Sequence, residues 1–300
     1  MSRRSIVDQR AQIQQSAARL LECLSGSPLV SVGCPACESI KQTPVTTRQG
    51  VSYVRCGTCS CFYVPRRPTE EALVEMYRRF PESARGHEIQ TCDSRAEERE
   101  AQYRLKRILQ VVPAGRLLDL GCGTGHLLRI ARPFFDGIGV DVAPRPKPME
   151  DGIQYFQGRL EDTSFQEESF HVVGAFEVLE HLFDPASTLR AVHRVLMPSG
   201  MFVFQTGDAD SLRARLGPES WPYLQPPVHL NVFGRRSLAI LLRRTGFRIV
   251  KAWSFGRGPS RIMETTGLRY PEFLRPLLEV AARFGIVGRM YAASRLDGSI

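Results

Sequence analysis

The sequence has few lysines and no long apolar run. Of its 40 basic residues only Lys41, Lys106, Lys147 and Lys251 are lysines, and no basic run exceeds two residues. The formal net charge of +9 therefore indicates a solvated arginine-rich surface, and nucleic acid is not the partner we expect. No apolar stretch approaches the ~18 residues that a membrane helix needs. Arginines near the start are not followed by the apolar segment of a signal peptide, so we expect a cytoplasmic protein without membrane insertion.

Cysteine is also scarce, which excludes a disulfide scaffold, but the cysteines present are clustered. Five of the eight lie within residues 34–61, and four of them form two CxxC pairs separated by 18 residues: Cys34, Cys37, Cys56 and Cys59. At this spacing four thiolates can surround a zinc ion and leave no open coordination position, so the zinc would be structural. Cys61 is an alternative ligand to Cys59, and a redox pair is disfavoured because no βαβ frame surrounds the motif.

Composition shifts divide the chain into four parts. We expect an amphipathic helix within residues 1–29, a zinc-binding module at 30–68, and a helix capped by Thr69 with a polar linker at 69–93. In residues 94–300, strand-like and helical segments alternate. Strands are predicted at 116–120, 137–141, 153–156, 170–176, 201–206 and 247–254, and helices at 94–112, 126–132, 185–196 and 236–245. This pattern predicts a doubly wound, Rossmann-like α/β fold with a mainly parallel sheet.

A glycine-rich turn follows the first strand of this region. Gly121, Gly123 and Gly125 alternate directly after Asp119, where glycine allows a tight turn that exposes backbone amides to a ligand. His126 stands where a dinucleotide fingerprint has its third glycine, and Asp119 would repel a pyrophosphate but attract a cationic ligand. Twenty residues beyond Gly121, Asp141 ends the next strand, where an acid can accept both hydroxyls of a ribose.

These motifs resemble those of the class I S-adenosylmethionine-dependent methyltransferases over about residues 95–254. The resemblance implies that Asp119, Gly121, Cys122, Gly123 and Gly125 hold the methionine half of S-adenosylmethionine, that Asp141 holds the ribose, and that Leu160, Glu161 and Phe176 complete the site. His171 and Arg159 depart from the family pattern, which affects the adenine contacts. Residues 33–80 resemble a zinc module that precedes many bacterial methyltransferases, some of which act on sugar nucleotides.

A third motif indicates the acceptor side. Glu177, Glu180 and His181 would share one face of a helical turn, and His229 would join them if its loop folds over the strand ends. The arrangement is similar to the magnesium-binding Glu/Glu/His/His set of the O-methyltransferases of ubiquinone biosynthesis and the small-RNA 2'-O-methyltransferases. Manganese or zinc would fit this divalent-cation site as readily, and a metal-free site is the alternative.

Residues 207–233 are interpreted as an acceptor lid, in which Trp221 and Tyr223 either pack against the acceptor or anchor the segment to the core. Residues 270–293 are expected to form a C-terminal helical extension that closes the domain or forms the face of a homodimer.

The predicted function is methyl transfer from S-adenosylmethionine to a hydroxyl of a small molecule, with His181 or His229 as the catalytic base. Three alternatives stay open: carbon methylation of a nucleotide sugar, methylation of an RNA ribose, and a non-catalytic zinc-ribbon binding module with a degenerate methyltransferase fold.

Overall fold

The computed structural model describes residues 15–81, 94–144, 154–221, 223–255 and 288–296. Its largest element is a seven-stranded sheet in the order β12-β13-β10-β9-β6-β7-β8. The strands are β6 (Gly115–Leu120), β7 (Phe135–Asp141), β8 (Gln154–Gln157), β9 (Phe170–Phe176), β10 (Leu196–Gly207), β12 (Phe247–Phe255) and β13 (Gly288–Arg295). The strands from β10 to β8 run parallel, and β13 is antiparallel to both of its neighbours. The predicted doubly wound fold is confirmed.

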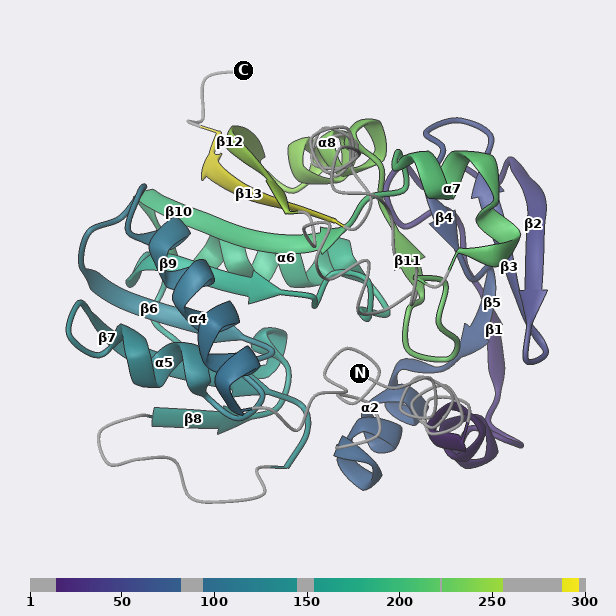
Figure 1. The fold of residues 1–300 in the computed structure, drawn as a ribbon, viewed down its shortest axis with the longest axis horizontal. Coiled ribbons are helices and arrows are strands. Elements are labelled where there is room, and N and C mark those ends of the chain that lie inside the picture. Colours follow the sequence, from purple (N-terminus) through teal and green to yellow (C-terminus); the bar gives the residue numbers. More distant parts are fainter. Residues whose placement is uncertain (1–14, 82–93, 145–153, 222, 256–287, 297–300) are drawn as a thin grey trace, which may run out of the picture.

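Helices cover both faces of this sheet (Figure 1). On one face, α4 (Ser94–Ile108) and α5 (His126–Ala131) bury Ile108 and Leu128. On the other, α6 (Pro185–Val195) and α8 (Arg235–Arg244) bury Val192 and Leu241. Helix α6 begins where the sequence favours it, because the Asp184 carboxylate accepts hydrogen bonds from two amides of the first turn, and Pro185 lacks the amide that would go unpaired there.

The N-terminal part begins with a helix over residues 15–23, followed by two small sheets. β1 (Leu29–Ser31) pairs with β5 (Arg66–Pro68), and a four-stranded sheet has the order β11-β4-β3-β2. Its strands are β2 (Gln42–Arg48), β3 (Val51–Cys56), β4 (Phe62–Tyr63) and β11 (Asn231–Val232). Because β11 belongs to the segment at 207–233, the region expected as a separate module shares a sheet with the region expected as a lid (Figure 1). Helix α2 (Glu70–Arg79) follows, with Thr69 as its cap as predicted.

The predicted C-terminal helix is wrong where the structure describes it. Residues 288–293 belong to β13, and residues 270–287 lie outside the described part of the chain. Met290 and Ala292 pack in the core on one face of the sheet, while Tyr291 and Ala293 pack in the core on the other. The buried centre of β13, residues 290–293, is apolar at every position, so this short run cannot be distinguished from a buried helix by periodicity.

The segment expected to form a lid has secondary structure of its own. The segment at 207–233 is more regular than expected, since it contains α7 (Leu212–Leu216), a 3-10 turn at Pro218–Ser220 and β11. Trp221 is buried and packs edge-on against Phe62 of β4, so it anchors this segment to the N-terminal sheet. Within the described ranges, no helix is long and apolar enough to cross a lipid bilayer.

Candidate functional site

The glycine turn lies at the carboxyl end of β6, at the edge where the parallel strands end. Gly121, Gly123 and Gly125 have φ values of 69°, 54° and 79°, a region that side chains disfavour. A Cβ atom on Gly121 would lie 2.6 Å from Cγ2 of Val178, in the turn that follows β9. The glycine turn and the segment carrying the acceptor-side residues therefore touch each other.

Asp141 is fixed against this turn. Its Oδ2 accepts a hydrogen bond from the Gly123 amide at 2.9 Å, and its Oδ1 accepts one from the Ala143 amide at 2.9 Å. A carboxylate fixed in this way is a hydrogen-bond acceptor, as the hydroxyls of a ribose require. The predicted proximity of Asp141 to the glycine turn is confirmed, and its contact with a ribose stays a prediction.

Asp119, near the end of β6, is buried between the neighbouring strands β7 and β9. Its burial raises its pKa to about 7, because a desolvated carboxylate is disfavoured. The nearby Asp141 adds to this shift, while Arg104 opposes it. A cationic ligand at this edge would stabilise the ionised form, so Asp119 suits an ammonium or sulfonium group.

The other predicted cofactor residues have structural partners of their own. Cys122 is buried, and a Cβ on Gly139 would lie 2.6 Å from its sulfur. Leu160 is fully buried in the core, and Oε1 of Glu161 accepts a hydrogen bond from the Thr188 hydroxyl at 2.5 Å. The Phe176 ring lies 5.0 Å below the Arg104 guanidinium. Their contacts with a cofactor stay predictions.

The two departures from the family pattern also have structural partners. Nδ1 of His171 accepts a hydrogen bond from the Arg116 amide at 3.1 Å. Arg159 forms ion pairs with Asp162 and, at 2.7 Å, with Glu70 of α2, so it connects the two parts of the chain.

A cluster of ionisable side chains lies at the end of β9. Glu180, His181 and His229 offer ligand atoms that lie within 4.8 Å of one another, and Glu180 and His229 are buried. The main chain brings the two segments together, because the amides of Leu230 and Asn231 both donate to the Glu180 carbonyl, at 2.8 and 3.1 Å. The predicted meeting of His229 with the Glu180-His181 pair is confirmed.

Glu177 does not join these three residues as predicted. Residues 178–181 form a turn and not a helix, and Glu177 has a φ of 57°. Its carboxylate instead accepts hydrogen bonds from Nε2 of Gln205 at 2.6 Å and from the Tyr223 hydroxyl at 3.0 Å. The same Tyr223 hydroxyl contacts Glu180, so a tyrosine connects the two acids. An i, i+3 spacing places two side chains together only if the segment is helical.

The four paired cysteines come together where the turn after β1 meets the turn after β3. The sulfurs of Cys34 and Cys59 are 3.4 Å apart, those of Cys37 and Cys56 are 3.6 Å apart, and all four lie within 4.8 Å of one another. A tetrahedral zinc with bonds of about 2.3 Å separates its sulfurs by about 3.8 Å. The hydrogen bond from Cys59 lowers the pKa of the Cys34 thiol. Cys61 lies outside the cluster, since its sulfur faces the carbonyls of Phe62 and Val232.

Comparison with known proteins agrees with this architecture. Residues 95–252 match the methyltransferase domain family, which is more than half of the chain. The chain belongs to this methyltransferase family. The resemblance to class I S-adenosylmethionine-dependent methyltransferases is thereby confirmed.

Individual relatives of the methyltransferase match it in part. It is 40% identical over 100 residues to a ubiquinone biosynthesis O-methyltransferase of Cereibacter sphaeroides, an alignment that covers 30% of this chain and 40% of that protein. The chain thus spans under half the length of this curated relative.

Two solved structures share the fold. A 1,6-didemethyltoxoflavin N1-methyltransferase of Burkholderia thailandensis has a TM-score of 0.51 at 18% identity, covering 85% of this chain and 99% of its own. A geranyl diphosphate C-methyltransferase of Streptomyces coelicolor also has a TM-score of 0.51 at 18% identity, covering 67% and 81%.

In the methyltransferase, residues outside the matched region also reach the acceptor side. The hydroxyl of Tyr77, from α2, lies 3.1 Å from Nδ1 of His181, and the hydroxyl of Tyr53, from β3, donates to the His229 carbonyl at 2.8 Å. Sequence reasoning missed both roles, because nothing in the local pattern of either tyrosine indicates a partner more than a hundred residues away.

Arg67 is a second residue that the sequence did not single out. It is fully buried and donates to the Val64 and Phe183 carbonyls and to Oδ1 of Asn231, at 2.9, 3.2 and 3.2 Å. Burial lowers its pKa to about 10. This buried guanidinium holds three segments of the chain together. It therefore fixes the position of β11, the strand that follows His229 and Leu230.

Proposed function

We propose that this chain transfers a methyl group from S-adenosylmethionine to a hydroxyl of a small molecule. The observation that carries the proposal is the convergence of Glu180, His181 and His229 within 4.8 Å, in a turn that touches the glycine turn through Val178. The similarity to a ubiquinone biosynthesis O-methyltransferase supports an oxygen acceptor. Methyl donor and acceptor would then meet at the carboxyl edge of β6 and β9.

On the donor side, the residues of the edge bind and orient. The Asp119 carboxylate would pair with the ammonium group of the methionine half, and Asp141, held by two amides, would accept the ribose hydroxyls. When bound, S-adenosylmethionine would supply a methyl group activated by the sulfonium, and its transfer to the acceptor oxygen would leave a neutral thioether. Because the leaving group is already activated, placement about 3 to 3.5 Å apart supplies most of the catalysis.

The hydroxyl proton would go to a histidine. Nδ1 of His181 lies 3.0 Å from the Val228 carbonyl, and Nδ1 of His229 lies 2.5 Å from the Tyr223 carbonyl. A carbonyl can only accept, so both neutral rings carry their proton on Nδ1 and present an unprotonated Nε2. Oε1 of Gln205, beside Glu177, is buried without a hydrogen-bond partner among the described residues, so it would accept a hydrogen bond from the acceptor molecule.

The same donor set fits a divalent cation. The set consists of one carboxylate and two imidazole rings, and backbone carbonyls fix the tautomer of each ring. Manganese or zinc accepts such a set readily and magnesium less so. The Glu180 carboxylate accepts a hydrogen bond from the Thr206 hydroxyl at 3.0 Å and contacts the Tyr223 hydroxyl, which would orient it as a ligand. When bound, such a cation would lower the pKa of the acceptor hydroxyl.

We also propose that Cys34, Cys37, Cys56 and Cys59 hold a structural zinc. The spacing of their sulfurs fits a closed tetrahedral site, and closed sites contribute to folding and not to catalysis.

The acceptor-side proposal is tested with Mn²⁺ as the probe, by electron paramagnetic resonance of the bound ion. We expect Glu180→Gln to weaken Mn²⁺ binding at least tenfold and Glu177→Gln, the matched control outside the cluster, to change it less than threefold. S-adenosylhomocysteine affinity should be unchanged in both variants. Mn²⁺ affinity that does not respond to Glu180→Gln contradicts the cation site, and labelled methyl appearing on carbon in cell extract contradicts the hydroxyl acceptor.

A further inference from the structure

A cleft of about 520 Å³ lies between the N-terminal sheet and the segment that follows β10. One wall is formed by Thr43, Arg55 and Phe62, which are cross-strand neighbours on β2, β3 and β4. The other wall consists mainly of small residues, together with an arginine: Ala209, Ala214, Arg215 and Pro218. Pro44 and Val45 complete the lining. This volume falls in the range of small-molecule sites, and no function assigned above uses it.

The charges of the lining have one sign. It contains two arginines, one on each wall, and no acidic residue. Arg55 is exposed, lies 5.8 Å from the centre of the Phe62 ring and forms no ion pair with the described residues. An anion in the cleft would therefore meet positive charge from both sides without displacing an existing partner of Arg55.

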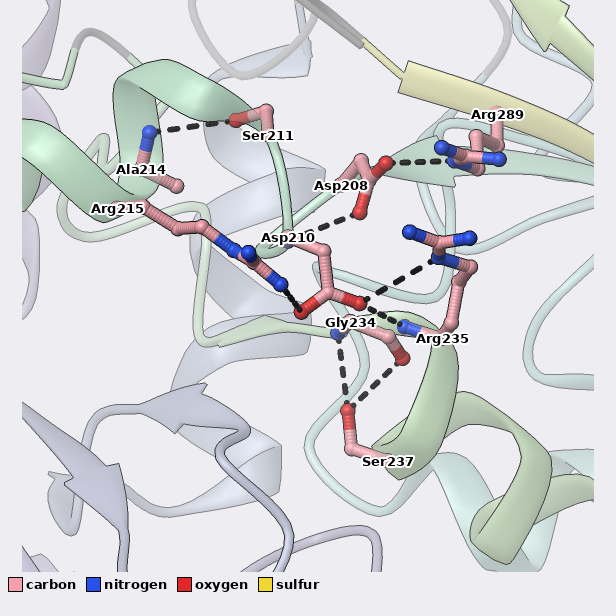
Figure 2. Close-up of polar contacts among 9 residues, drawn as sticks. All are labelled: Asp208, Asp210, Ser211, Ala214, Arg215, Gly234, Arg235, Ser237 and Arg289. Carbon is pink, nitrogen blue, oxygen red and sulfur yellow. Dashed lines mark hydrogen bonds and ion pairs between the residues drawn. The ribbon is translucent and has the colours of Figure 1, made fainter. Parts of the chain in front are cut away.

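Arg215 is only loosely held by its acidic neighbour. Its guanidinium lies 3.7 Å from Oδ1 of Asp210, and its side chain is 63% exposed. The other oxygen of Asp210 accepts a hydrogen bond from the Arg235 amide at 2.7 Å (Figure 2). Asp208, the second acid nearby, pairs with Arg289 at 2.6 Å (Figure 2). Arg215 would therefore give up only one long, exposed ion pair, so it can reach an anion at little cost.

The apolar part of the lining adds a second requirement. Phe62 lines the cleft with Val45 and Pro218, although little of its side chain is exposed. We propose that the cleft binds a small aryl anion, a phosphate ester or carboxylate whose ring packs against this apolar lining and whose charge lies between Arg55 and Arg215. This inference is independent of methyl transfer.

The cleft is connected to the acceptor side by aromatic contacts. Phe62 packs against Trp221 with ring centres 6.3 Å apart, and Trp221 stacks on Tyr223 at 5.4 Å. The Tyr223 hydroxyl in turn contacts Glu177 and Glu180. A ligand on Phe62 would change the surroundings of Trp221, which supplies a signal for binding.

The test uses the full chain carrying Trp253→Phe, in which Trp221 is the only tryptophan. Phenyl phosphate and benzoate are titrated separately, followed by Trp221 emission and, in parallel, by calorimetry, which detects binding even if emission does not change. The two anions distinguish a phosphate ester from a carboxylate ligand. Neutral benzamide is the control for the ring, and inorganic phosphate is the control for the charge.

We expect saturable one-site binding of at least one aryl anion, at least tenfold tighter than benzamide and tighter than inorganic phosphate. Arg55→Gln and Arg215→Gln should each weaken it about tenfold, or about 1.4 kcal/mol, whereas Arg190→Gln, an exposed arginine on α6, should have no effect. No saturable binding of either anion, equal affinity for benzamide, or unchanged affinity in both cleft variants would overturn the proposal.

Discussion

The donor side and the acceptor side of this methyltransferase are built in different ways. Asp119, Gly123 and Asp141 lie on two adjacent parallel strands and the turn between β6 and α5, so a short stretch of sequence forms the donor side. The acceptor side joins the turn after β9 to a loop before β11, and the N-terminal sheet holds that loop. The first is therefore a local structure, and the second depends on contacts between distant segments.

This difference predicts that loss of the zinc cluster disrupts the acceptor side and leaves the donor side intact. We expect the double variant Cys34→Ser/Cys56→Ser to lose bound zinc and the rigidity of β3 and β4, and with them the position of His229. Mn²⁺ binding should fall at least a hundredfold, while calorimetry shows S-adenosylhomocysteine affinity within about threefold of wild type. Cys23→Ser, outside the cluster, is the control. Loss of both binding activities together would contradict the separation.

A smaller effect is expected from pH, on the donor side alone. Because burial raises the pKa of Asp119 to about 7, its carboxyl is protonated below pH 7 and cannot pair with an ammonium group. Affinity for S-adenosylmethionine should be constant well above pH 7 and fall towards tenfold per pH unit below it. Asp119→Asn should bind weakly with a flatter profile, as calorimetry between pH 5.5 and 8.5 would show. The same steep decline in Asp119→Asn would assign the titration to another group.

The local character of the donor side also explains what the sequence could predict. A glycine turn between an apolar strand and a helix has a defined shape wherever it occurs. The spacing of the paired cysteines likewise indicates a zinc site without any knowledge of the fold. Tyr77, Tyr53 and Arg67 have no such local signal, because their roles arise only when α2, β3 and β5 pack against the large domain. Glu177 was misplaced for a related reason, since the path of the chain after β9 is set by packing and not by helix propensity.

Tyr223→Phe should have an intermediate effect, on the acceptor side. The variant keeps the ring that stacks on Trp221 and loses the hydroxyl shared by Glu177 and Glu180. One charge-assisted hydrogen bond is worth about 1.5 to 3 kcal/mol, so Mn²⁺ affinity should change by about tenfold or more. Tyr291→Phe, a buried tyrosine of β13, should leave it unchanged. Equal Mn²⁺ affinity of the two variants would show that the Tyr223 hydroxyl does not contribute to the site.

Tyr77→Phe should have the smallest effect. We expect a change of a few fold in Mn²⁺ affinity, because the Val228 carbonyl still holds the proton on Nδ1 of His181. With only six histidines in the chain, nitrogen-15 spectra of labelled histidine can follow this ring directly. Changed ring signals of His181 with unchanged signals from His193 would indicate positioning by Tyr77. Spectra identical to wild type would show that α2 does not influence the acceptor side.

The central claim is that the edge of β6 and β7 binds S-adenosylmethionine through Asp141 and the glycine turn. Calorimetric titration of S-adenosylhomocysteine into the full chain and its Asp141→Asn variant tests this most directly. We predict one site per chain in the wild type and an affinity at least thirtyfold lower in the variant, since the ribose hydroxyls lose a charged acceptor. No binding to the wild type, or equal affinity in both proteins, would contradict the account.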